Sequence, residues 1–152
     1  MLPSTNSSSS GQSLVEVVVT TAIAVLILVA LVAGATVAVR NIQYSRTRAR
    51  AMELNRQATE WLRSERAKGW SEFLSKFNNG YYCLNSLSFT NPGRCESAEL
   101  IDGVFKCEVN LAKETDPVNP GIIDKVTVTV VTSWTDSQGE HREEVVTYLT
   151  RW

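Results

Sequence analysis

Glu16 is the residue whose position most directly suggests chemistry, because a long apolar run follows it at once. The run from Val17 to Val39 has 23 residues and no charged side chain. A carboxylate beside such a run is costly to bury unless a cation pairs with it. Residues four apart share one helix face, so a free amino group on Gln12, from the same chain or a neighbouring one, would supply that cation. The alternative is an interfacial glutamate among lipid headgroups.

His141 is the only histidine, and it lies among charged residues beside a turn. A metal site or a Cys–His nucleophile needs partners at ligand spacing, and the sequence offers none. It also contains no glycine-rich phosphate-binding loop. We therefore expect a solvated turn histidine, no catalytic, cofactor or metal site, and no enzyme.

The three cysteines allow three different single disulfides. If the C-terminal part lies outside the cytoplasm, a Cys83–Cys95 bridge closing one loop is the natural pairing. Cys107 alternates with the apolar residues of the segment 104–111, which is a strand pattern with Cys107 on the core side. We expect it to be a buried free thiol rather than the partner of Cys95.

One long helix from Gln12 to about Lys68 would carry these N-terminal residues. It contains no proline, and its apolar run would span about 35 Å, enough to cross about 30 Å of hydrocarbon. Beyond Val39 the pattern becomes amphipathic. The predicted buried face consists of Tyr44, Thr47, Ala51, Leu54, Ala58 and Trp61. That face needs a partner surface from the rest of the chain.

The remainder, residues 69–152, reads mainly as strands. A turn or two of helix is expected near Trp70–Phe77, and strands are expected at about 104–111, 125–134 and 141–151. Short turns between the last strands favour an antiparallel meander. The predicted fold class is α+β, with the long N-terminal helix packed against a small C-terminal sheet in one domain.

Charge is distributed unevenly, although the 152-residue chain has a net charge of only −1. Residues 40–68 hold eight basic and three acidic side chains, whereas residues 69–152 hold seven and twelve. Arginines without interleaved aromatic residues are weak evidence for nucleic-acid binding, so we expect a solvated face or pairing with acidic neighbours. Taken alone, this basic flank would place the C-terminal part in the cytoplasm.

The segment Gly11–Glu16 followed by the apolar run resembles the class III signal of type IV pilins and type II secretion pseudopilins. Trp134, Gly139 and the segment 145–149 also resemble the end of minor pilins. The resemblance implies that a prepilin peptidase cuts between Gly11 and Gln12, that the new Gln12 amine is methylated, and that Glu16 pairs with the N-terminus of an adjacent subunit. The chain departs from the family in having Gln12 instead of phenylalanine and no basic residue in the leader.

The resemblance also implies an organisation and a location. Residues 1–11 would be the leader, 12–39 the transmembrane and filament-core helix, 40–68 its amphipathic continuation, and 69–152 a pilin-like head. The expected partners are other pilin-like subunits, the prepilin peptidase, the membrane and the inner-membrane assembly machinery. The subunit, which we expect to be a minor one, would be a single-pass protein of the cytoplasmic membrane with an extracytoplasmic head. It would then enter a surface or periplasmic filament for adhesion, motility, DNA uptake or secretion.

Two other interpretations stay open. The chain could be a signal-anchored single-pass protein that keeps residues 1–11, carries a small α+β domain and forms no filament. Alternatively, Ala33-Gly34-Ala35 fits the cleavage site of a conventional signal peptide, which would release a secreted domain.

Overall fold

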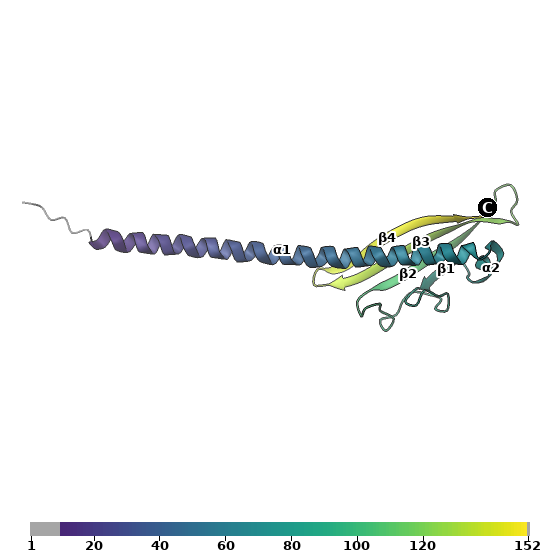
Figure 1. The fold of residues 1–152 in the computed structure, drawn as a ribbon, viewed down its shortest axis with the longest axis horizontal. Coiled ribbons are helices and arrows are strands. Elements are labelled where there is room, and N and C mark those ends of the chain that lie inside the picture. Colours follow the sequence, from purple (N-terminus) through teal and green to yellow (C-terminus); the bar gives the residue numbers. More distant parts are fainter. Residues whose placement is uncertain (1–9, 152) are drawn as a thin grey trace, which may run out of the picture. The chain divides into compact units, whose positions relative to one another are not determined.

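The structure is a computed structural model that describes the backbone of residues 10–151 and the side chains of residues 14–151. The chain forms two compact units, one up to Ser45 and one from Arg46 onward. The elements, labelled in Figure 1, are α1 (Ser10–Ala67), α2 (Trp70–Ser75), β1 (Gly80–Cys83), β2 (Lys106–Thr115), β3 (Ile123–Asp136) and β4 (Gly139–Thr150).

Helix α1 runs without a break through both units, and its bounds lie within two residues of the predicted ones. It continues through Gly34, as expected for a helix without proline. The helix ends where Gly69 adopts a φ of 148°, a backbone conformation that side-chain-bearing residues rarely adopt. The chain then turns directly into the short helix α2, which buries Phe73.

The four strands form one antiparallel sheet in the order β1-β2-β3-β4, so the predicted meander and the α+β class are confirmed. Val109, Val130 and Val145 lie opposite one another across β2, β3 and β4. Strand β1 was not among the predicted strands. Its four residues are too few to show an alternating pattern, and they become a strand by pairing with β2, Tyr82 opposite Val109.

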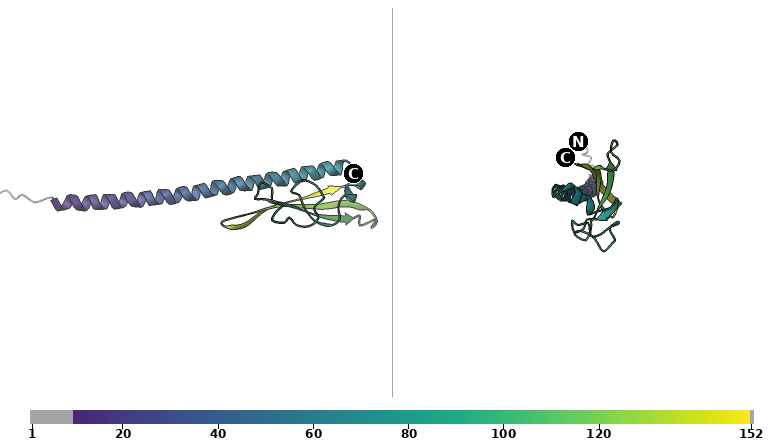
Figure 2. Two further views of the ribbon diagram at one scale, coloured as in Figure 1. Left: turned by 90° about the horizontal axis from the view of Figure 1, so that it is seen from below. Right: turned by 90° about the vertical axis from the view of Figure 1, so that its right-hand side faces the viewer.

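Within the second unit, the part of α1 from Arg46 to Ala67 lies along one face of the sheet (Figure 2). Ala58 and Leu62 pack in one core cluster with Val109, Val128 and Val130, and all five are fully buried. A second cluster joins Ala51 and Leu54 to Phe105 and Trp134. This apolar stripe is the predicted amphipathic face, and it is covered by the strands of the same chain.

The buried face of α1 is wider and more polar than predicted. Asn55, Thr59, Glu65 and Arg66 are buried, whereas Tyr44 is exposed. Asn55 donates a hydrogen bond to the carbonyl oxygen of Glu143 (3.0 Å) and accepts one from the hydroxyl of Thr132 (2.7 Å). A periodicity argument that counts only apolar residues misses such a position, because burial here depends on partners in β3 and β4.

Candidate functional site

The candidate assembly residues all lie in the first turns of α1. Gly11 and Gln12 are helical, and their side chains are outside the described residues. Glu16 is exposed, and no side chain in the described range 14–151 forms a hydrogen bond or salt bridge with its carboxylate. The pairing predicted with the Gln12 amine therefore stays a prediction. Glu16 places its carboxylate at the start of the apolar surface.

The threonine hydroxyl groups within the apolar run donate hydrogen bonds to backbone carbonyl oxygens of α1 itself. Thr20 donates to the carbonyl oxygen of Glu16 (2.8 Å), and Thr21 donates to that of Val17 (2.6 Å). Thr36 donates to the carbonyl oxygen of Ala33 (2.8 Å). Polar groups that bond to their own helix remove the main cost of placing threonine in hydrocarbon.

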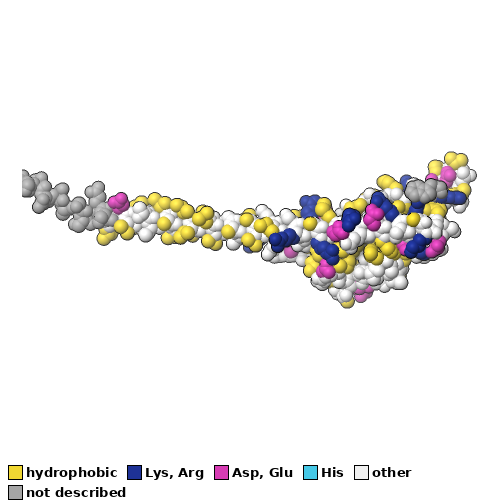
Figure 3. Space-filling model, in the orientation of Figure 1, with side chains coloured by type: hydrophobic (Ala, Val, Ile, Leu, Met, Phe, Trp, Pro, Cys, Tyr) yellow, Lys and Arg dark blue, Asp and Glu magenta, His cyan; other side chains and the backbone are white. Residues whose placement is uncertain are grey.

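The apolar run is uncovered over its whole length. Every residue from 14 to 39 is exposed, and Leu26, Leu28 and Leu31 have exposed fractions of 69%, 60% and 64%. Figure 3 shows these apolar side chains along the N-terminal half of α1, with charged side chains beginning where the run ends. In the described part of the chain, α1 is the one helix long and apolar enough to cross a membrane. A surface this apolar requires a partner, and a single-pass membrane anchor is compatible with it.

Two arginines in the amphipathic half of α1 reach acidic residues that are distant in sequence. Arg48 pairs with Glu143 of β4 (2.7 Å), and Arg50 pairs with Asp102 in the loop before β2 (2.9 Å). These contacts agree with the expectation that the arginines meet acidic neighbours. Because both pairs are at least partly exposed, each contributes little to stability, and their main effect is to neutralise charge.

The cysteines lie at the junction of β1, β2 and the loop between them. A disulfide joins Cys83 at the end of β1 to Cys95, with their Cα atoms 4.8 Å apart. Cys107 on β2 is a buried free thiol, and burial raises its pKa. The Glu99 carboxylate lies within 4.8 Å of the two bridged sulfurs, but sulfurs in a disulfide provide no thiolate to a metal ion. The disulfide therefore has a structural role, closing the loop that places Phe89 against the aromatic residues of the core.

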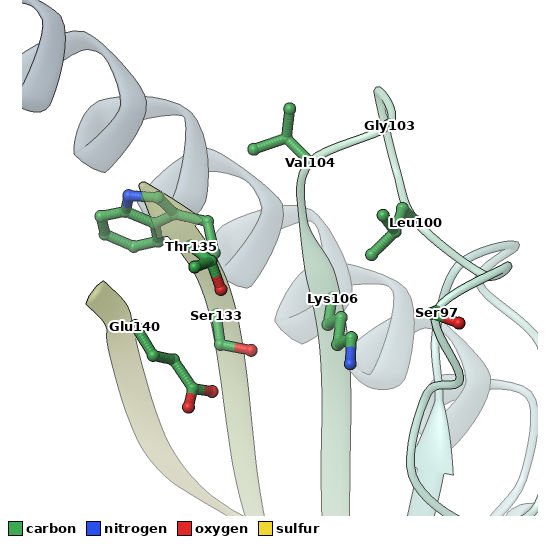
Figure 4. Close-up of a pocket in the computed structure, with 9 residues that line it drawn as sticks. Ser97, Leu100, Gly103, Val104, Lys106, Ser133, Thr135 and Glu140 are labelled. Carbon is green, nitrogen blue, oxygen red and sulfur yellow. The ribbon is translucent and has the colours of Figure 1, made fainter. Parts of the chain in front are cut away.

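A pocket of about 270 Å³ opens between the end of the sheet and the loop before β2 (Figure 4). Lys106 and Ser133 are opposite one another in the β2–β3 register, and both line the pocket. Among the nine described lining residues, no hydrogen bond joins a hydroxyl group to a basic side chain. The lining consists of Ser97, Leu100, Gly103, Val104, Lys106, Ser133, Trp134, Thr135 and Glu140.

His141 is more enclosed than expected for a solvated turn residue. Its side chain is 22% exposed and lies 2.9 Å from the carboxylate of Asp136. The imidazole ring stacks on Trp134 with the ring centroids 5.3 Å apart. No local sequence pattern signals this contact, because it depends on the pairing of Trp134 with His141 across β3 and β4.

Comparisons of the chain with protein-family models, with curated proteins and with solved structures found no match. The resemblance to pilins therefore rests on the N-terminal motif and on the residues near the C-terminus. Sequence reasoning missed Asn55, Thr132 and the partners of Arg48 and Arg50, since all of these depend on contacts across more than 50 positions of the chain.

Proposed function

We propose that this chain is a subunit of a type IV pilus-like or pseudopilus filament, processed by a prepilin peptidase between Gly11 and Gln12. The observation that carries the proposal is the exposed apolar half of α1 with the carboxylate of Glu16 at its start. Neither feature has a partner among the described residues of the chain. A membrane followed by a bundle of identical helices would supply both partners.

The proposed mechanism begins in the cytoplasmic membrane, where residues 17–39 cross the bilayer and the head lies outside. An assembly machine in the inner membrane then moves the subunit into a helical filament, and neighbouring apolar helices replace lipid. In that core the Glu16 carboxylate pairs with the methylated Gln12 amine of an adjacent subunit. Because an unpaired buried charge costs several kcal/mol, roughly 3–5 when one partner is removed, the pair also fixes the register between subunits.

The disulfide supports an extracytoplasmic head. A bridge such as Cys83–Cys95 forms and persists in oxidising compartments and is rare in the cytoplasm. The arginines that follow the apolar run favour the opposite topology by the charge rule. Arg48 and Arg50 pair with acidic residues of the head, which weakens their effect as free positive charges once the head has folded.

Within the proposed family we favour a minor subunit. The residues near the C-terminus, including Trp134 and Gly139, support this choice by their resemblance to minor pilins. Such filaments serve adhesion, motility, DNA uptake or secretion. The role proposed for this chain is assembly, without catalysis.

A second candidate is a signal-anchored single-pass protein that keeps residues 1–11 and forms no filament. The basic flank from Arg40 to Arg50 favours it, because a flank of this kind is typical of a cytoplasmic domain. The two candidates differ in whether Glu16 matters. In a simple anchor, an interfacial glutamate can be replaced with little effect.

The experiment compares Glu16→Ala with Thr20→Ala in the cells that produce the protein. Thr20 lies one turn further along α1, and its hydroxyl is already satisfied by the Glu16 carbonyl. The account predicts normal cleavage and membrane insertion for both variants. It also predicts a loss of more than about a hundredfold in filament incorporation for Glu16→Ala alone, since the neighbour's amine is left unpaired. Incorporation of Glu16→Ala at the unchanged level would refute the pairing.

A further inference from the structure

The arginines of α1 fall into three groups according to their partners. Four form salt bridges: Arg48 and Arg50 with the head, and Arg56 and Arg63 with Glu53 and Glu60 on the same helix. Arg66, near the end of α1, donates to the carbonyl oxygen of Thr150. Arg40 and Arg46 are exposed, and neither pairs with any carboxylate in the described part of the chain.

Arg40 and Arg46 are also the two arginines nearest to the apolar run. Arg40 follows Val39 directly and is the first charged residue after Glu16, and Arg46 is the next basic residue. Tyr44 lies between them in the sequence with 38% of its surface exposed. Tyrosine and arginine next to a membrane-spanning helix are typical of the lipid headgroup region, where long basic side chains extend toward the phosphates.

We propose that Arg40 and Arg46 bind the phosphate groups of anionic phospholipids in the leaflet on the side of the head. The guanidinium group suits this ligand, because its planar array of N–H donors matches two phosphate oxygens at once. The inference rests on the membrane anchoring in the proposed function, but it requires neither cleavage at Gly11 nor filament formation.

The salt bridges of the other arginines explain why the lipid site is confined to these two residues. Glu143 and Asp102, which Arg48 and Arg50 contact, belong to the folded head. Once the head has folded, these two arginines present little net charge to a membrane surface. Arg40 and Arg46 keep their full charge and bind lipid, which fixes the depth of the helix before assembly.

The test uses the full-length chain in lipid nanodiscs that contain phosphatidylglycerol and phosphatidylcholine. Native mass spectrometry or a pull-down with lipid analysis measures which lipid is retained. The unchanged chain should retain phosphatidylglycerol preferentially, and the preference should fall as ionic strength rises. Each arginine is expected to contribute about fivefold, so the double variant Arg40→Gln/Arg46→Gln should reduce the preference about twenty-fivefold.

The matched control is Arg56→Gln/Arg63→Gln, which removes the same charge from the same helix at residues that already have carboxylate partners. It should keep the preference for phosphatidylglycerol. Equal loss in both double variants would show a general charge effect and would overturn the site. Loss of the preference on addition of inorganic phosphate at constant ionic strength would assign the arginines to a soluble anion, which would also overturn the membrane proposal.

Three further outcomes relate this inference to the proposed function. A chain that does not insert into the nanodiscs would contradict the membrane anchoring on which both depend. A chain that inserts without any preference for the anionic lipid would overturn the lipid site alone. If the Arg40→Gln/Arg46→Gln variant retained the lipid preference but failed to enter filaments, the two arginines would contact neighbouring subunits, and the lipid proposal would be wrong.

Discussion

The two halves of α1 place their apolar side chains in opposite surroundings. In the half from Leu14 to Val39, leucine and valine point outward on every side and nothing in the described part of the chain covers them. In the half from Arg46 to Ala67, Leu54 and Leu62 are buried against the sheet, and charged residues occupy the opposite side. One unbroken helix therefore contains one segment that the chain itself covers and one that needs an external partner.

The difference follows from the periodicity of the sequence. Apolar residues at every position cannot all face one sheet, whereas apolar residues at spacings of three and four can. The first pattern predicts lipid or other helices as the surroundings, and the second predicts an intrachain core. Stability of the head and retention in the membrane should therefore respond to different halves of the helix.

The largest expected effect comes from the same substitution made in each half. Leu62→Ala should lower the free energy of unfolding of the second unit by about 2–5 kcal/mol, because Leu62 is fully buried in its core and the substitution leaves a cavity. Leu28→Ala, at a position 60% exposed, should change it by less than about 0.5 kcal/mol.

Denaturant unfolding of the full-length chain in detergent, followed by tryptophan fluorescence, measures both variants. Trp61, Trp70 and Trp134 all lie in the second unit, so the fluorescence reports the unfolding of that unit. Equal destabilisation by the two substitutions would mean that the N-terminal half of the helix also packs on the head, and the comparison would fail.

The disulfide should give the next largest effect. Replacing both Cys83 and Cys95 by serine should lower the unfolding free energy by about 3 kcal/mol, since the bridge closes a short loop with a sequence separation of 12 residues. Retention in the membrane should not change. Reducing the unchanged protein should reproduce the loss, and reductant should have no further effect on the double variant. A reductant-sensitive double variant would show that Cys107, its last cysteine, forms a bridge with another molecule.

The smallest expected effect concerns Glu65, whose carboxylate is buried near the end of α1. Hydrogen bonds from Lys68 and then Lys76 lower its pKa. Because the folded-state pKa lies below the unfolded value of about 4.3, Glu65 stabilises the fold at neutral pH, and this contribution is lost as the pH falls through the folded-state pKa. Glu65→Gln should cost up to about 1 kcal/mol at neutral pH and flatten the acid limb of the stability curve.

Urea unfolding at a series of pH values tests this prediction. Glu60→Gln is the control, because Glu60 pairs with Arg63 on the same helix and is 55% exposed. Its acid limb should follow that of the unchanged protein. If Glu65→Gln kept the same dependence on pH as the control, the ion pairs of Glu65 would contribute nothing to stability.

Much of the fold was predictable from the sequence, because it depends on local patterns. The absence of proline and the change of periodicity after Val39 predicted α1, and the alternation of valine and threonine predicted β3. Strand β1 was not predictable, since its four residues become a strand only through β2. The burial of Asn55 was missed for the same reason, because its partners lie on β3 and β4.

The candidate site, like the fold, was only partly predictable from the sequence. The spacing of Gly11 and Glu16 and the length of the apolar run are visible in the sequence, and the structure adds that Glu16 has no partner among the described residues. The distribution of salt bridges along α1 was not visible. It requires knowing that Arg48 meets Glu143, a residue 95 positions away.

The measurement that tests the central claim most directly is the N-terminal sequence and mass of the protein recovered from cells. The account predicts a chain that begins at Gln12 and carries one added methyl group. A chain that begins at Gln12 without the methyl group would keep the filament class and remove only the modification. A chain that begins at Met1, or at Thr36 after a conventional signal peptide, would contradict the account, because neither chain would have a free amine on Gln12 to pair with Glu16.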